Sequence, residues 1–117
     1  MALDPSCSAF QAAVGILARP WNARLLTLLQ RRALRFTELT QGLPGIGDKI
    51  LSARLKQLEA TALVVRRVHP GPPIRAEYAL TRKGRAFRKL AAAIQRWGHE
   101  LVDGGPSEGG GDRTRPS

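Results

Sequence analysis

Residues 43–69 read LPGIGDKILSARLKQLEATALVVRRVH, and the fold can be inferred from them. A turn with one proline and two glycines precedes an amphipathic helix, which we expect over residues 48–61. A run rich in β-branched residues follows almost at once and includes Arg66, Arg67 and His69. Positive charge therefore stands both on the predicted helix and directly behind it.

The 48–61 helix has two faces of different chemistry. At about 100° per residue, Leu51, Leu55, Leu58 and Ala62 fall within roughly 60° of one another, so we expect this face to pack on the core. The opposite face fits the major groove of B-DNA, because small residues let the backbone approach while long side chains contact phosphates and base edges. On spacing alone, a solvated helix surface is equally open. The candidate DNA-binding residues are Lys49, Ser52, Lys56 and Gln57, with Arg54 on the flank.

A hairpin is predicted behind this helix. LVVRRV and IRAEYAL both have the composition of strands, and the segment HPGPP between them predicts a protruding, semi-rigid loop. Arginines in such a wing enter a minor groove or bind phosphates, so DNA contacts are expected at the wing residues Arg66, Arg67, His69 and Arg75. Alternatively, Glu77 pairs with Arg66 or Arg67 across the strands and gives one of them a structural role.

The flanking segments complete the expected order of elements. Asp4 is a candidate N-cap for a first helix, residues 21–32 predict a second, and 34–36 a very short strand. Thr37 is a plausible N-cap for a short third helix, and Thr81 for a long last helix to about residue 102. Arg35 and Thr37 are expected to contact the DNA backbone, although Thr37 is equally well explained as a cap alone.

The fold class expected from this order is α+β and mainly α. The order is α-α-β-α-α-β-β-α, a winged helix-turn-helix with N- and C-terminal dimerisation helices. Residues 1–102 are predicted to form one DNA-binding and dimerisation domain. Residues 103–117 lack large apolar side chains and predict a flexible, Gly-rich tail.

The first and last helices carry apolar stripes at helical spacing. The stripe on the last helix exceeds what a small winged helix can cover by itself, so we expect a two-fold dimer interface, with packing within one subunit as the alternative. The candidate interface residues are Phe10, Val14, Leu17, Phe87, Leu90, Ile94, Trp97 and Leu101.

Composition favours a partner rich in phosphate. The chain carries 19 Lys and Arg against 9 Asp and Glu, a formal net charge of +10, and its field therefore attracts polyanions. The sequence shows no paired carboxylates, no phosphate-binding loop and no nucleophile with a base, so we do not expect an enzyme. No metal or cofactor site is expected either. No apolar run approaches the length of a membrane span, and no export signal is evident, so the expected location is cytoplasmic.

Taken together, the motifs resemble those of the HxlR-type regulators within the MarR-like winged-helix group. The resemblance rests on RFTEL, LPGIGDKILSARLKQLEATALVVRRV, PPIRAEYALTRKGR and WG, in family order and at family spacing. It implies a homodimeric, sequence-specific regulator that binds a double-stranded DNA operator and has no enzymatic activity. Gly47 and Ala62, at the two ends of the predicted recognition helix, depart from the Ser and Gly usual in the family. A nonspecific, chromatin-type DNA-binding protein is the alternative, because its phosphate contacts would look alike.

Cys7 is the only cysteine, which excludes an intramolecular disulfide. We expect it near the third position of the first helix, where the helix dipole encourages thiolate chemistry. It resembles the N-terminal cysteine through which some family members sense oxidants or electrophiles. The alternative is a small, buried apolar residue.

Overall fold

The computed structural model describes residues 2–103 and confirms the predicted winged helix-turn-helix fold. The predicted tail lies almost wholly outside these residues and remains a prediction. The chain divides into two units, Met1–Phe87 and Arg88–Ser117, and each is described by itself. The elements are α1 (Ser8–Ala18), α2 (Asn22–Leu28), β1 (Leu34–Arg35), α3 (Phe36–Gly42), α4 (Asp48–Ala60), β2 (Val64–His69), β3 (Arg75–Leu80), α5 (Arg82–Arg85) and α6 (Phe87–Asp103).

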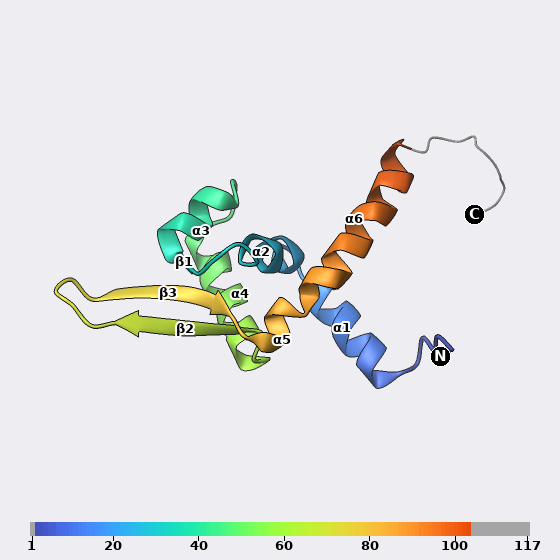
Figure 1. Ribbon diagram of the computed structural model, residues 1–117, viewed down its shortest axis with the longest axis horizontal. Coiled ribbons are helices and arrows are strands. Elements are labelled where there is room, and N and C mark those ends of the chain that lie inside the picture. Colours follow the sequence, from blue (N-terminus) through green and yellow to red (C-terminus); the bar gives the residue numbers. More distant parts are fainter. Residues whose placement is uncertain (1, 104–117) are drawn as a thin grey trace. The chain divides into compact units, whose positions relative to one another are not determined.

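A three-stranded antiparallel sheet forms the wing, with strand order β1-β3-β2. The two long strands run side by side away from the helices to the hairpin loop (Figure 1). Arg66 pairs with Tyr78 and Arg67 with Glu77 across β2 and β3, while Arg35 of β1 pairs with Glu77 from the other side. Because directly opposed residues share a face of a sheet, this register fixes which side chains can meet.

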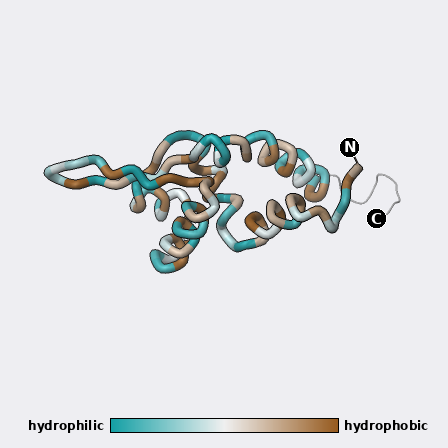
Figure 2. Tube along the Cα trace, turned by 90° about the horizontal axis from the view of Figure 1, so that it is seen from below, coloured by the Kyte–Doolittle hydropathy of each residue, from teal (hydrophilic) through white to brown (hydrophobic). Residues whose placement is uncertain are grey.

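The core of the first unit is built almost entirely from leucines. Fully buried leucines of α2, α3 and α4 pack together, and the ends of β2 and β3 add Val64 and Leu80. The outer part of the hairpin contributes little to this core, since Val65, Val68 and Ile74 are exposed. Hydrophobic and hydrophilic residues are accordingly mixed along the hairpin out to its loop (Figure 2).

The N-terminal helix begins later than the sequence predicts. The Asp4 carboxylate accepts hydrogen bonds from the backbone N–H and the hydroxyl of Ser6, and the backbone N–H of Cys7 donates to the carbonyl of Asp4. Asp4 thus closes a turn instead of capping the helix, because its carboxylate accepts hydrogen bonds from Ser6 and not from the first N–H groups of α1. Helix α1 starts at Ser8, and Cys7 is its N-cap residue, not its third residue.

Helix α3 also differs from its predicted start. It begins at Phe36 with Arg35 as N-cap residue, so Thr37 lies in the first turn and is not the cap. The Glu38 carboxylate accepts a hydrogen bond from the backbone N–H of Arg35 at 2.8 Å and bonds the guanidinium of Arg32 at 3.1 Å. The bond from Arg35, reinforced by that from Arg32, holds the pKa of the Glu38 carboxyl below its usual range.

The predicted last helix is divided at Ala86 into α5 and α6. Thr81 caps α5 as expected, because its hydroxyl accepts a hydrogen bond from the N–H of Gly84. Phe87 packs against the core of the first unit. Helix α6 is amphipathic, and along it Leu90, Ile94, Trp97 and Leu101 are all at least 40% exposed. None of the helices in residues 2–103 has the length and apolar character of a membrane span.

Candidate nucleic-acid interface

Helix α4 presents the two faces that its sequence predicts. Gly47 adopts the extended N-cap conformation, and Asp48 places a negative charge in the first turn, where the helix dipole favours it. Leu51, Leu55 and Leu58 are at most 1% exposed and anchor the helix in the core. The position of α4 is therefore set by three leucine side chains on one face.

The face of α4 opposite these leucines is open to solvent. Lys49, Ser52, Ala53 and Lys56 are all exposed. Small residues stand between the two lysines, so another molecule can approach the helix backbone while both ammonium groups contact it. The exposed face thus keeps the predicted combination of small and cationic side chains.

Arg54 and Gln57 are placed differently from the other predicted DNA-binding residues of α4. The guanidinium of Arg54 donates from Nε to the carbonyl of Pro20 at 2.9 Å and from an Nη to Oε1 of Gln57 at 3.3 Å. Both side chains are only partly exposed. They connect α4 to the segment between α1 and α2, a contact between distant parts of the chain that helical spacing cannot reveal.

The segment between α1 and α2 is itself unusual. Trp21 adopts a left-handed conformation, with φ 77°, at the start of α2. The guanidinium of Arg24 lies 4.4 Å from the centre of the Trp21 ring, a cation–π distance. The Trp21 ring also approaches Gly45, which has φ 95° in the turn before α4. This segment therefore contacts both the turn before α4, at Gly45, and α4 itself, at Arg54.

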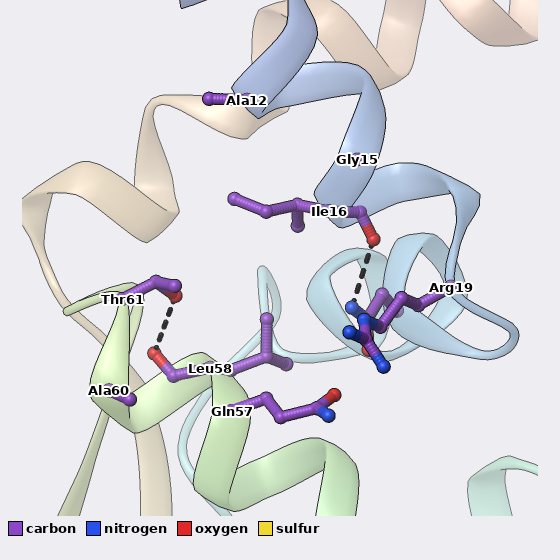
Figure 3. A pocket seen from close by; sticks show the side chains of 9 residues that line it. Ala12, Gly15, Ile16, Arg19, Gln57, Leu58, Ala60 and Thr61 are labelled. Carbon is purple, nitrogen blue, oxygen red and sulfur yellow. Dashed lines mark hydrogen bonds between the residues drawn. The ribbon is translucent and has the colours of Figure 1, made fainter.

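A cleft of about 420 Å³ separates α1 from the C-terminal half of α4 (Figure 3). The buried side chain of Asn22 donates from Nδ2 to the carbonyl of Ile16 at 2.9 Å, which ties α1 to α2 at the edge of the cleft. Sequence reasoning did not find this cleft, because its walls come from separate helices. Its lining residues are Ala12, Gly15, Ile16, Arg19, Asn22, Gln57, Leu58, Ala60 and Thr61.

The C-terminal end of α4 corrects the prediction for Ala62. This residue is exposed and does not continue the leucine face. It has φ 63°, and the N–H groups of Ala62 and Leu63 donate to the carbonyls of Glu59 and Leu58. These two bonds form a Schellman motif, so the left-handed helix end usual for glycine is kept with an alanine.

The wing places its cations on two faces of the sheet. Arg66 shares a face with Val64 and Tyr78, the side turned to the core, while Arg67 shares the outer face with Glu77. The expected pairing of Glu77 is corrected: its Oε1 lies 3.1 Å from Nε2 of His69, a diagonal neighbour, and the described residues show no ion pair between Glu77 and an arginine. Arg35 and Arg75 are exposed on the same outer face as Glu77.

The remaining candidate residues lie outside the helix-turn-helix and wing. The thiol-bearing Cys7 is exposed at the start of α1, which corrects the alternative of a buried residue. Phe10 and Val14 on α1 are about half exposed, whereas Leu17 is partly buried. Among residues 2–103, no group of three or more Cys, His, Asp or Glu is arranged to bind a metal ion.

The chain resembles known regulators in both sequence and structure. It is 39% identical over 97 residues to the uncharacterized HTH-type transcriptional regulator YvaP of Bacillus subtilis, covering 83% of this chain and 90% of YvaP. It is 33% identical to YodB of the same species, and the reduced form of YodB superposes with a TM-score of 0.79 over 85% of this chain and 97% of YodB. The reduced form of the redox regulator HypR has a TM-score of 0.76 at 27% identity, covering 82% of this chain and 95% of HypR.

The family assignment follows from these likenesses and from a direct match. Residues 16–105, which include the whole helix-turn-helix and wing, match the HxlR-like helix-turn-helix family. The chain belongs to the HxlR-like helix-turn-helix family of transcriptional regulators.

Proposed function

We propose that this protein is a sequence-specific transcriptional regulator that binds duplex DNA as a homodimer, with α4 in the major groove and the wing on the backbone or in the minor groove. The observation that carries this proposal is the exposed face of α4, where Lys49, Ser52 and Lys56 stand opposite three buried leucines. Family membership and the surplus of positive charge support it. The location we propose is the cytoplasm, where the chromosome lies in a bacterium such as Bacillus subtilis, the source of YvaP and YodB.

Lys49 gives an energetic reason for an anionic partner. Its charge lies in the first turn of α4, where the helix dipole disfavours a cation by a few tenths of a kcal/mol. A DNA phosphate beside the ammonium group offsets this cost. Arg35, Thr37 and the wing arginines then contact the backbone on either side of the groove. Arg54 and Gln57 support the helix from its flank.

The dimer is proposed from the two exposed apolar stripes. Phe10 and Val14 on α1, and Leu90, Ile94, Trp97 and Leu101 on α6, leave apolar surface that a second copy would bury. A two-fold axis through such an interface places two copies of α4 on half-sites about 10 base pairs apart.

A response to oxidants or electrophiles through Cys7 is a second part of the proposal. The residue is exposed, and the relatives include regulators with described reduced, diamide-treated and quinone-bound forms. With one cysteine in the chain, oxidation would give an intersubunit or mixed disulfide, and a quinone would alkylate the sulfur. If the Cys7→Ser variant binds and releases DNA in the same way as the wild type under oxidant or quinone, Cys7 is not the sensor.

The proposal is tested by titrating the protein with duplex DNA from upstream of its own gene and with a scrambled duplex, at two salt concentrations. We expect a sequence-specific regulator to bind the upstream duplex roughly 10³-fold or more tightly than the scrambled duplex. Both affinities fall with salt, because phosphate contacts release counterions. A ratio of the two affinities near one would support the nonspecific, chromatin-type alternative and overturn the proposal of a sequence-specific regulator.

A further inference from the structure

The outer face of the wing gathers charged side chains from all three strands. Arg35 comes from β1, Arg67 and His69 from β2, and Arg75 and Glu77 from β3. Glu77 is directly opposite Arg35 on one side and Arg67 on the other, and His69 is directly opposite Arg75. We call these five residues the wing-face cluster.

A hollow of about 260 Å³ opens within this cluster. Arg35, His69, Arg75, Ala76 and Glu77 line it, so residues from all three strands border the same space. A water molecule in the liquid takes up about 30 Å³, and the hollow therefore has room for a phosphate group with part of its hydration shell. Its arginines supply the fork-shaped donors that phosphate oxygens accept best.

His69 and Glu77 make the charge of the hollow variable. Nε2 of His69 lies 3.1 Å from Oε1 of Glu77, and this pair requires a hydrogen on Nε2, because a carboxylate only accepts. The arginines stay charged, whereas a histidine gains or loses its charge between about pH 5 and 8. The charged residues around His69 are Glu77, which it contacts, and Arg35, Arg67 and Arg75 on the same face of the sheet.

We propose that the wing-face cluster is a DNA phosphate site whose occupation is linked to protonation of His69, with Glu77 as the residue that positions the imidazole. This inference rests on the proposed function, because the phosphate belongs to bound duplex DNA. A phosphate in the hollow adds negative charge beside the imidazole and offsets the repulsion from the arginines. Binding then takes up protons, and affinity falls as the pH rises through the range in which His69 loses its proton.

Proton uptake on DNA binding tests this inference directly. The full chain is titrated calorimetrically at pH 7 with the duplex from upstream of its own gene, in buffers of different ionisation enthalpy. We expect a fraction of a proton to be taken up per protomer, and Kd to rise about fivefold between pH 6 and 8, within the limit of tenfold per pH unit for one proton. In the His69→Gln variant both effects should disappear.

His99 provides the matched control, because it is also exposed and also pairs with a carboxylate, Asp103 on α6. The His99→Gln variant should take up protons like the wild type. Glu77→Gln keeps the imidazole but removes its partner, and it should reduce proton uptake while tightening binding at pH 8.

Two results would contradict the inference. Proton uptake that persists in both His69→Gln and Glu77→Gln would overturn it, and so would wild-type binding with no proton uptake at all; the proposed function survives in both cases. Failure of the wild type to bind any duplex would instead overturn the proposed function, and this inference with it.

Discussion

Ala62 carries the clearest backbone strain in the helix-turn-helix region. A left-handed conformation brings Cβ close to the following carbonyl oxygen and costs an alanine about 1–2 kcal/mol. We predict that Ala62→Gly stabilises the protein by about 1 kcal/mol, because glycine has no Cβ and already fits the Schellman motif. Chemical denaturation measures the change in the free energy of unfolding.

The control for this prediction is Ala53→Gly, within α4 and also exposed. There the backbone is helical, and glycine should cost about 1 kcal/mol. Opposite signs for the two variants are expected. A loss of stability in both would show that Ala62 is not strained.

Single residues also show what the sequence could and could not predict. The spacing of Leu51, Leu55 and Leu58 predicted the buried face of α4, because a helix fixes its own periodicity. Helical spacing also predicted the position of Arg54 around α4. Its role, however, depends on a hydrogen bond to the carbonyl of Pro20, 34 residues away, which spacing cannot show. His69 likewise pairs with Glu77 only because the strand register brings them together.

Helix α4 is the element that we propose to lie in the major groove of DNA. We predict that Lys56→Ala weakens specific binding far more than Lys89→Ala on α6 and lowers the salt dependence by about one counterion. Titrations at several salt concentrations give both quantities. Equal losses of affinity for the two variants would refute the placement of the recognition helix.

Helix α5 makes a close contact that depends on glycine. A Cβ at Gly84 would collide with the carbonyl oxygen of Leu63, whereas one at Gly15 of α1 would meet nothing within 4 Å. We therefore predict that Gly84→Ala destabilises the fold by about 2 kcal/mol or more, and that Gly15→Ala stabilises it by up to about 1 kcal/mol. Thermal or chemical denaturation checks both, and a tolerated Gly84→Ala would contradict the packing of α5.

Most elements could be predicted because each has a local signal. The local sequence indicated Asp48 at the start of α4, Thr81 before α5 and the loop between β2 and β3. The break at Ala86 was not, since residues 81–102 contain no proline and keep a helical pattern. The start of α1 was missed because the Asp4 side chain bonds Ser6 instead of capping the helix.

We propose that DNA binding by the whole molecule depends on dimerisation. We predict that Ile94→Glu, on the apolar stripe of α6, shifts the protein to monomers and weakens specific binding at least tenfold, because one half-site alone remains in contact. Gln95→Glu introduces the same charge one residue away and should stay dimeric. Sedimentation analysis measures the oligomeric state, and a binding titration measures the affinity. If the Ile94→Glu variant remains dimeric, the apolar stripe of α6 is not the dimer interface.

Hydroxyl-radical footprinting of the DNA upstream of the gene would show whether a dimer of this chain places two copies of α4 in successive major grooves. We expect two protected segments about 10 base pairs apart, related by a two-fold axis, and we expect Lys56→Ala to weaken the protection of both. Protection that is uniform along the duplex, or that Lys56→Ala leaves unchanged, would contradict this placement of α4.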